Sequence, residues 1–499
     1  YYNAVFGNCT SLVKVTLNSS LTSLCGRMFK GCTALTSIDL PDSLTWLGYT
    51  ETFANTGLTS IKIPAGVTGL CQTSGNNSDK NTSLFSGCTS LTTVILPAGI
   101  SDFGIGGSVF KNCSALTTIK VGEDGENNVL SGVTLLGTNA FESAGIESLS
   151  LPNLTSIGAS AFTKSKVKSV SLPQLTTLAN SLFASCTSLT QVVLNDNAEA
   201  LGNSMFEGCT ALKTITLPSN LTHLGKTTFK GSGITSIVIP DGVTHISDKS
   251  GSPAGTGVSV YVFQNCKQLE SVTLPANLQT MGQYVFDGCS KLATVTYTSG
   301  TEEGNSLPQT LTLVGNYAFR NCTSLTNMKL PGVTTAGTYL FSGCTKLEKV
   351  VLGDYFTALP NYAFSGCSKL AEINLGAVAT VGTYAFQNCK ALKEADFEKA
   401  VSIGATAFSG CTALQTVNIP MATSIGSSAF KSCTSLVEVT LSDDAYVTLG
   451  ASAFSGCTLL SQINLASVKS VGANCFENCK MLATAELSNA TSVGNSAFA

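Results

Sequence analysis

The chain has 499 residues, a formal net charge of −3 and only 11% charged residues. This balance argues against a nucleic-acid-binding protein, because binding to phosphates needs clustered Lys and Arg. The mean hydropathy is +0.27, yet no apolar run approaches the ~20 residues that a membrane-spanning helix requires.

A phenylalanine recurs along the whole chain and marks an internal repeat. Successive anchors are mostly 21 to 25 residues apart, and four spacings are 31 to 34. Self-similarity at so short a period indicates a solenoid, in which each unit buries its apolar face against its neighbours. The anchors are Phe6, Phe29, Phe53, Phe85, Phe110, Phe141, Phe162, Phe183, Phe206, Phe229, Phe263, Phe286, Phe319, Phe341, Phe364, Phe386, Phe408, Phe430, Phe454, Phe476 and Phe498.

Each repeat contains two predicted strands. In the clean copy that begins at Phe206, the first strand is 212–217, where apolar residues alternate with Thr. Pro218 ends it, because proline cannot donate a hydrogen bond to a ladder. The second strand is 221–224, and Gly225 permits a tight turn after it. We therefore predict a mostly β fold: one elongated, curved solenoid domain over 1–499, with about twenty repeats and a parallel sheet on its concave face.

The repeat has the pattern L-x-x-I-x-L-P-x-x-L-T-x-I-G-x-x-A-F-x-G-C over nearly the whole chain. This pattern resembles the BspA-like leucine-rich repeats of bacterial surface proteins. The resemblance implies a leucine-rich-repeat fold and a secreted or surface-anchored protein of a host-associated microbe. It also implies adhesion to host matrix or to other cells. The motif brings no catalytic residue and no cofactor with it.

Sixteen of the 19 cysteines follow an anchor Phe by three residues, as Cys367 follows Phe364. Four repeats have another residue there, namely Thr56, Ala144, Ser165 and Ser232. In those four repeats the turn to the next strand is one residue shorter, without exception. This correlation favours packing, because a buried thiol behaves as a small apolar group that fills a space in the longer turn. Disulfides within the column stay an alternative, because neighbouring Cα atoms would be about 5 Å apart.

Five segments interrupt the regular repeat: 71–84, 101–108, 122–132, 247–260 and 298–310. Surface loops on a rigid scaffold often bind partners, and insertions in repeat proteins often gather on the binding face. We therefore expect binding residues in the later two insertions, at Asp248, Lys249, Glu302 and Glu303. Neutral variation in tolerant turns explains the insertions equally well.

The outward positions of the first strand are the third and fifth residues of L-x-x-I-x-L. In the last third of the chain they are rich in carboxylates and amides, which predicts an acidic strip able to attract a basic partner. Aromatic residues are almost absent there, which disfavours a glycan ligand. The carboxylates of this strip are Glu372, Glu394, Asp396, Glu438 and Glu486.

Metal sites are weaker alternatives. His223 and His245 occupy the same slot in consecutive repeats, where two imidazoles could share a metal ion, although no third ligand is evident. The acidic turn 122–128 could hold Ca²⁺, but it does not match an EF-hand loop. Solvated side chains explain both features more simply.

The chain begins and ends inside a repeat, without the polar caps that solenoids need. We expect it to be part of a longer chain that carries a leader, caps and an anchor. The sequence thus favours a non-enzymatic surface or secreted module that binds a protein or another macromolecule, with no nucleic-acid partner and no cofactor. The alternative is a structural spacer that holds other domains away from a cell surface. Insertions clustered on one face would favour the first.

Overall fold

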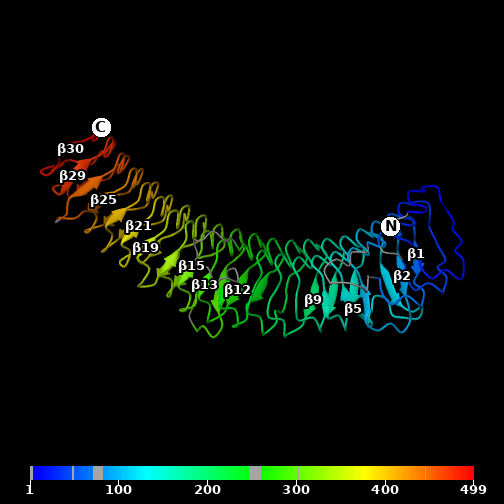
Figure 1. Ribbon diagram of the computed structural model, residues 1–499. Coiled ribbons are helices and arrows are strands. Elements are labelled where there is room, and N and C mark those ends of the chain that lie inside the picture. Colours follow the sequence, from blue (N-terminus) through cyan, green and yellow to red (C-terminus); the bar gives the residue numbers. More distant parts are fainter. Residues whose placement is uncertain (1–3, 48–49, 71–82, 247–259, 302, 444) are drawn as a thin grey trace. The chain divides into compact units, whose positions relative to one another are not determined.

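The computed structural model describes residues 4–47, 50–70, 83–246, 260–301, 303–443 and 445–499. They fall into two compact units, Tyr1–Ile234 and Thr235–Ala499, whose strands are drawn as arrows in Figure 1. Both consist of short strands joined by turns. The described part of the chain has no helix, and so none that could cross a membrane. The predicted mostly β fold is confirmed, whereas a single domain over 1–499 stays a prediction.

In the first unit, the first strands of successive repeats pair in the sheets β1-β2-β4 and β6-β8-β9, and the second strands pair in the sheet β3-β5-β7. The strands are β1 Ser60–Lys62, β2 Thr93–Leu96, β3 Phe103–Ile105, β4 Thr118–Val121, β5 Val133–Leu136, β6 Ser148–Ser150, β7 Ser156–Ile157, β8 Ser169–Leu172 and β9 Gln191–Leu194.

In the second unit, the first strands pair in the sheets β10-β12-β14, β16-β18-β20 and β22-β24-β26-β28. The second strands pair in β11-β13-β15-β17 and in the longer sheet β19-β21-β23-β25-β27-β29-β30. The strands are β10 Ser236–Val238, β11 His245–Ile246, β12 Ser271–Leu274, β13 Thr280–Met281, β14 Thr294–Tyr297, β15 Leu313–Val314, β16 Asn327–Leu330, β17 Thr335–Ala336, β18 Lys349–Leu352, β19 Ala358–Leu359, β20 Glu372–Ile373, β21 Thr380–Val381, β22 Glu394–Asp396, β23 Ser402–Ile403, β24 Thr416–Asn418, β25 Ser424–Ile425, β26 Glu438–Thr440, β27 Val447–Leu449, β28 Gln462–Ile463, β29 Val468–Val471 and β30 Ser492–Val493.

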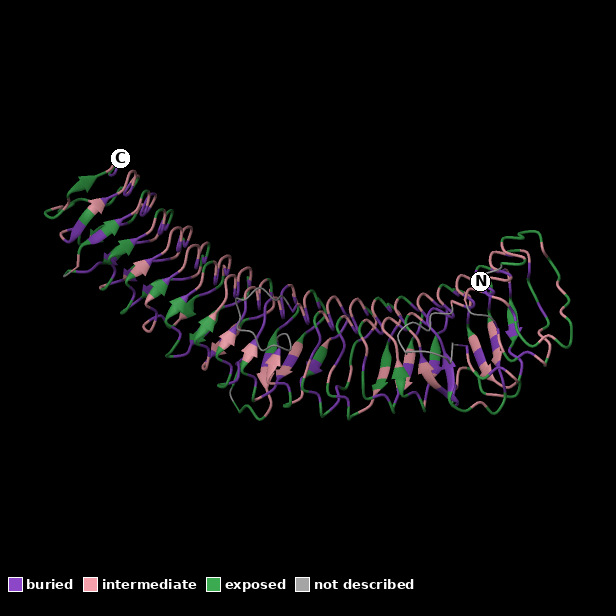
Figure 2. Cartoon of the chain, in the orientation of Figure 1, coloured by how far each residue is buried: buried purple, intermediate pink, exposed green. Residues whose placement is uncertain are grey.

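The pairing is parallel and in register from repeat to repeat. In β2 and β4, for example, Val94 lies opposite Ile119, and both are fully buried. The next outward residues, Ile95 and Lys120, are partly exposed. The first strands therefore alternate between the core and solvent, as Figure 2 shows by the green and pink bands on the arrows. One outward face thus carries side chains in rows across successive repeats.

The anchor phenylalanines form the core beside the strands. Their rings stack from repeat to repeat, with centroids 5.8 Å apart for Phe85 and Phe110 and 4.9 Å apart for Phe386 and Phe408. Positive backbone φ angles flank every anchor ring from Phe29 to Phe476 two residues before and two residues after, as at Tyr362 (58°) and Gly366 (78°) around Phe364. The recurrent Gly of the F-x-G-C motif is explained by this left-handed position.

The cysteine column fills the same core. Cys344, Cys367 and Cys411 are buried free thiols. The Cys367 Sγ donates to the carbonyl oxygen of Phe341 in the preceding repeat at 3.1 Å, and the Cys344 N–H of that repeat donates to the same oxygen at 3.0 Å. The packing interpretation is confirmed for these thiols, and each also joins two neighbouring repeats.

The four replacement residues occupy the same buried place. Thr56, Ala144, Ser165 and Ser232 are at most 4% exposed. In their shorter turns the next residue approaches the preceding repeat: the N–H of Gly145 donates to the carbonyl oxygen of Cys113 at 3.0 Å. A shorter turn therefore replaces one residue with a direct contact between the main chains of two repeats.

The reason predicted for Gly225 was wrong. Its φ is not positive, so no left-handed turn requires a glycine there. A Cβ at this position would lie 2.6 Å from main-chain atoms of Gly202 and Asn203. The residue is glycine because neighbouring repeats approach more closely than any side chain permits.

Two further sequence expectations need correction. Neither predicted strand of the repeat that begins at Phe206 forms: 212–217 makes no ladder with β9, and 221–224 has only the isolated bridge between Ala200 and His223. Residues of β9 and of 212–217 line a hollow of about 440 Å³. The expected interruption at 101–108, with its glycine-rich run, contains strand β3. Phe103, Gly104 and Ile105 are buried there and pair with β5. The alternation of apolar and polar residues predicted which residues are buried, but it does not predict the distance between neighbouring strands.

Candidate functional site: a hollow beside the insertion 298–310

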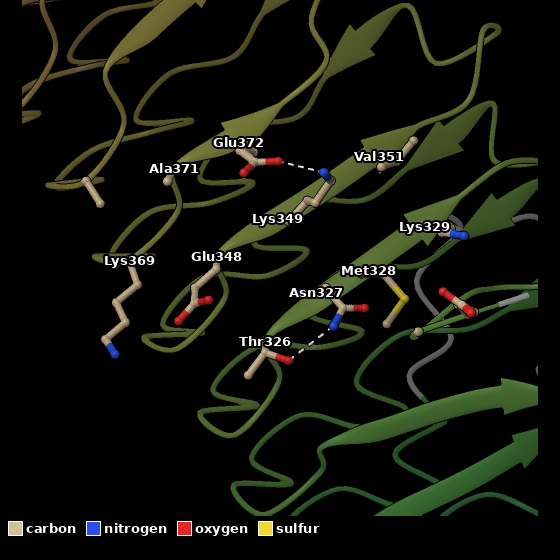
Figure 3. A pocket seen from close by; sticks show the side chains of 13 residues that line it. Thr326, Asn327, Met328, Lys329, Glu348, Lys349, Val351, Lys369, Ala371 and Glu372 are labelled. Carbon is tan, nitrogen blue, oxygen red and sulfur yellow. Dashed lines mark hydrogen bonds and ion pairs between the residues drawn. The ribbon is translucent and has the colours of Figure 1, made fainter.

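A hollow of about 690 Å³ lies on the outward face of the first strands in the second unit (Figure 3). Strands β16, β18 and β20 form its floor, and Glu303 and Gly304 of the insertion 298–310 lie at one end. Its remaining lining residues are Thr326, Asn327, Met328, Lys329, Glu348, Lys349, Val351, Lys369, Ala371, Glu372 and Ala391. The hollow therefore combines an insertion with the ordered rows of a sheet.

Charged side chains of both signs and apolar side chains lie side by side in this hollow. Lys349 lies opposite Glu372 in the register, and the Lys349 Nζ is 2.6 Å from the Glu372 Oε2. Figure 3 shows these two side chains pointing toward each other across the floor. Val351, with 37% of its surface exposed, and the exposed Ala371 contribute apolar surface. Apolar contact area next to charged and polar groups is a feature of protein-binding surfaces.

Asn305 fixes the insertion to the sheet. It is 5% exposed, its Oδ1 accepts from the N–H of Val295 at 2.8 Å, and its Nδ2 donates to the carbonyl oxygen of Ala293 at 2.9 Å. Its own N–H donates to the Oδ1 of Asn327 at 2.9 Å. The insertion thus adds a short rung between β14 and β16, and this rung holds the neighbouring Glu303 and Gly304 in place.

In the first unit, an Asn side chain attaches the insertion 122–132 to the first strand in the same way. The Asn128 Oδ1 accepts from the N–H of Ile119 at 2.8 Å, and Val129 forms a parallel bridge with Ser150. Glu123 at the tip forms an ion pair with Lys62 of β1 at 2.5 Å. This pairing lowers the pKa of Glu123, with the hydrogen bond from Lys62 as the main cause. Both described insertions therefore leave their repeat directly after the first strand.

The predicted site residues separate into three groups. Glu303 and Glu372 both line the hollow. Glu394, Asp396, Glu438 and Glu486 are exposed on the outward face of later repeats and do not line it. Asp248, Lys249 and Glu302 lie outside the described residues.

The carboxylates of the later repeats do not form a continuous row. Glu394 lies opposite Thr416, which lies opposite Glu438, which lies opposite Gln462. Like charges on directly paired strands repel each other, and the neutral residues keep these carboxylates two strands apart, about 10 Å. Asp396 accepts a hydrogen bond from the Asn418 Nδ2 at 2.8 Å. The acidic strip remains a predicted binding surface of widely spaced charges.

Sequence reasoning missed Lys349, Glu348, Lys369 and Val351. The signal was present, because 347–352 fits L-x-x-I-x-L and places Lys349 and Val351 at the outward third and fifth positions. The prediction considered only the carboxylates of the following repeats and so did not include Lys349 and Val351. That Lys349 would pair with Glu372 follows from the repeat spacing of 23 residues.

The histidines belong to different units, and the shared-metal alternative stays a hypothesis. The His245 Nδ1 lies 2.8 Å from the Thr280 Oγ1, and His223 forms a bridge with Ala200. Across the described ranges, no group of three or more His, Cys, Asp and Glu side chains is placed to hold a metal ion.

Comparison with known proteins gives a family and a set of similar folds. A family model described as a BspA-type leucine-rich repeat region matches residues 2–128, 134–250, 256–306, 301–411 and 380–499. The comparison with curated proteins gives no match.

Solved structures include bacterial leucine-rich repeat proteins. One from Bacteroides ovatus is 24% identical, with a TM-score of 0.49 and 85% of each chain covered. A leucine-rich cell surface protein from Faecalibacterium prausnitzii is 22% identical, with a TM-score of 0.39, and 77% of this chain and 88% of that chain are covered. One from Eubacterium ventriosum is 21% identical, with a TM-score of 0.38 and coverages of 71% and 82%.

Proposed function

Because the chain belongs to the BspA-type leucine-rich repeat family, we propose that it is a non-enzymatic interaction module of a secreted or cell-surface protein. Its partner is a protein or another macromolecule, from host extracellular matrix or from another microbial surface. The partner docks in the hollow beside the insertion 298–310. The observation that carries the proposal is the presence in one place of an anchored insertion, apolar side chains and charged groups of both signs.

Rigidity supports this assignment. Val351 and Lys349 project from a hydrogen-bonded strand, and the bond from the Asn305 N–H to the Asn327 Oδ1 of β16 ties the insertion to the same sheet. Side chains held in place before binding lose little conformational freedom on binding, which leaves more of the contact energy as affinity. The pair of Lys349 and Glu372 is exposed, and such pairs contribute little to stability. Its place in the hollow therefore suits selection of a partner with complementary charges.

The test is a binding screen of the purified chain at physiological salt against extracellular-matrix proteins, mucins, glycans and bacterial surface fractions. The central variant is Val351→Arg, which places a long charged side chain in the hollow. Its matched control is Thr440→Arg, which makes the same change at the equivalent outward position of β26. Two further variants are a trimmed 298–304 segment and the double change Glu394→Gln with Glu438→Gln.

Saturable binding that is lost in Val351→Arg and in the trimmed variant, and kept in Thr440→Arg, supports the hollow. Binding that survives Val351→Arg but is lost in the double Gln variant overturns this location and places the site on the acidic strip. No saturable binding to any class of target contradicts the interaction module and favours the structural spacer.

A further inference from the structure

Six consecutive repeats of the second unit carry a tyrosine two residues before the anchor Phe. Their rings form a second aromatic stack beside the phenylalanine stack, with neighbouring centroids 4.3 to 4.7 Å apart and interplanar angles of 5° to 25°. We call them the tyrosine row. Its members are Tyr261, Tyr284, Tyr317, Tyr339, Tyr362 and Tyr384.

The backbone holds these rings in a fixed position. All six tyrosines have positive φ angles, between 48° and 59°. A side chain other than glycine in this conformation is uncommon and carries a steric cost. The equivalent position in the repeats of Phe408, Phe430 and Phe454 is Thr406, Ser428 or Ser452. Stacking of the tyrosine rings offsets this steric cost. The rings are half-buried, so small oxidants can reach them.

We propose that the tyrosine row is an oxidative cross-linking site, where hydrogen peroxide and a peroxidase join adjacent tyrosines by a carbon–carbon bond. The established stack supplies the geometry, and the oxidant comes from outside the chain. The product is a covalent bond between neighbouring repeats that are 22 to 33 residues apart in sequence. Cross-links of this kind restrict the unfolded chain, as a disulfide that closes a loop does.

The chemistry balances with one molecule of hydrogen peroxide for each new bond. Two phenols each lose one electron and one proton from the O–H group and become phenoxyl radicals. The Cε carbons next to the two hydroxyls then form the new bond, and each of these carbons loses its proton while a phenol oxygen gains one, which restores both aromatic rings. The two electrons and two protons removed reduce hydrogen peroxide to two molecules of water.

The pair Tyr339 and Tyr362 is the best placed for coupling. Their ring centroids are 4.3 Å apart and their planes differ by 5°. Two reacting groups held this close in one molecule react faster than the same groups on two separate molecules, which must first meet in solution. One repeat before Tyr339, the Arg320 guanidinium lies 4.6 Å from the Tyr317 ring centroid. A cation over the face of a ring attracts the ring electrons, which makes one-electron oxidation of the ring less favourable. We therefore expect less coupling at Tyr317.

The chain contains its own control tyrosines. Tyr355 and Tyr446 are 76% and 63% exposed and belong to no tyrosine stack. An oxidant reaches them more easily than the tyrosine row, but they can couple only with another molecule. Links inside one molecule therefore report the row, and links between molecules report the exposed tyrosines.

The experiment treats a dilute solution of the chain 1–499 with a peroxidase and hydrogen peroxide. The monomer is isolated on a denaturing gel, and linked tryptic peptides are mapped by mass spectrometry. Cleavage after Lys346 and Lys349 separates Tyr339 from Tyr362, but the peptide 350–369 carries both Tyr355 and Tyr362. Fragmentation of the linked peptides and the two variants below therefore identify which tyrosine has reacted. Tyr362→Phe keeps the stacked ring and removes the reactive O–H. Tyr355→Phe is the matched control.

We expect the peptides of Tyr339 and Tyr362 to be linked in the wild-type monomer and in Tyr355→Phe, with blue dityrosine fluorescence. We expect the linked peptides to be absent from Tyr362→Phe. The cross-linked monomer should also unfold at a higher temperature than untreated protein. The proposal is overturned if Tyr355 forms links between molecules, which shows that the oxidant acted, while no tyrosines of the row are linked in the monomer.

Discussion

Asp287 accepts two hydrogen bonds from Arg320, at 2.8 Å from Nε and 2.9 Å from Nη2, although the two residues belong to different repeats. Each directly follows an anchor Phe, so stacking of the repeats brings them together. The Asp287 carboxylate is nearly fully buried, and the Gln264 Nε2 also donates to it at 3.0 Å. The pair raises the pKa of Arg320, mainly through its hydrogen bonds to Asp287.

Removal of one partner should therefore be costly. Arg320→Met leaves a buried carboxylate without its main partner, and we expect the free energy of unfolding to fall by about 2 kcal/mol. This is below the range for fully buried pairs, because Arg320 is one-third exposed. Urea unfolding measures the change. The double variant Asp287→Asn with Arg320→Met should regain part of the loss, and equal losses in the single and double variants would contradict this account.

The thiol column predicts a loss of stability in alkali. Burial raises the pKa of Cys344 and Cys411 from 9.0 to about 12. Because the folded state holds these protons more tightly than the unfolded state, this stability is complete below pH 9 and is lost as the pH rises toward 12. Urea midpoints at about pH 8 and about pH 10 measure the slope.

The control for this prediction is the pair of changes Cys344→Ser and Cys411→Ser, which should reduce the alkaline slope. A second readout is alkylation of the native protein near neutral pH. The exposed Cys9 should react quickly, whereas Cys344 and Cys411 should react only after unfolding, because the thiolate is the nucleophile. Rapid labelling of the two buried thiols in folded protein would contradict the prediction.

Glycines at the close contacts should not tolerate a methyl group. A Cβ at Gly404 would lie 2.6 Å from main-chain atoms of Gly382 and Thr383. Gly404→Ala should therefore lower the free energy of unfolding by about 2 kcal/mol, because the backbones must move apart. In Gly376→Ala the nearest atom is Glu398 Cδ at 3.8 Å, and we expect little change. Similar thermal transitions for both variants would refute the close-approach explanation.

Asn305 should control the insertion as well as stability. Asn305→Ala leaves the N–H of Val295 and the carbonyl oxygen of Ala293 without these partners. We expect a loss of about 2 kcal/mol and faster amide exchange in 298–306. Gln309→Ala, on the exposed side of the same insertion, is the control. Unchanged exchange in Asn305→Ala would show that the rung is held by other contacts.

Much of the fold could be predicted because the repeated pattern of apolar and polar residues indicates which side chains are buried. Buried residues such as Val94 and Ile119 alternate with outward residues along the strands. The cysteine three residues after the anchor Phe, such as Cys367, is present only where the turn is one residue longer, and this correlation indicated packing. The mostly β fold and the parallel stacking of first strands on first strands and second strands on second strands follow from this pattern. What the alternation cannot supply is the distance between main chains, and so both the missing ladder at 212–217 and the true reason for Gly225 could not be predicted.

The candidate site was less predictable, because it depends on the path of an irregular segment. Glu303 and Glu372 were expected to bind, but nothing in their spacing of 69 residues shows that one hollow joins them. That depends on the short rung formed by Asn305, whose amide replaces main-chain hydrogen bonds. The tyrosine row was visible as a repeated Tyr before the anchor Phe, but only its backbone conformation and ring distances indicate a chemical use.

The bond from the Cys367 thiol to the Phe341 carbonyl has a consequence for chain length. Every contact of this kind depends on one step along the stack and on nothing farther away. Deletion of the 22 residues from Phe386 to Ala407 would bring Cys411 to the carbonyl of Phe364 instead of that of Phe386, with the same partners at the new joint. From Phe319 onward, where successive anchors are 22 to 24 residues apart, the thiol contacts therefore have a translational periodicity, and we expect the removal of one whole period to leave the remaining contacts intact.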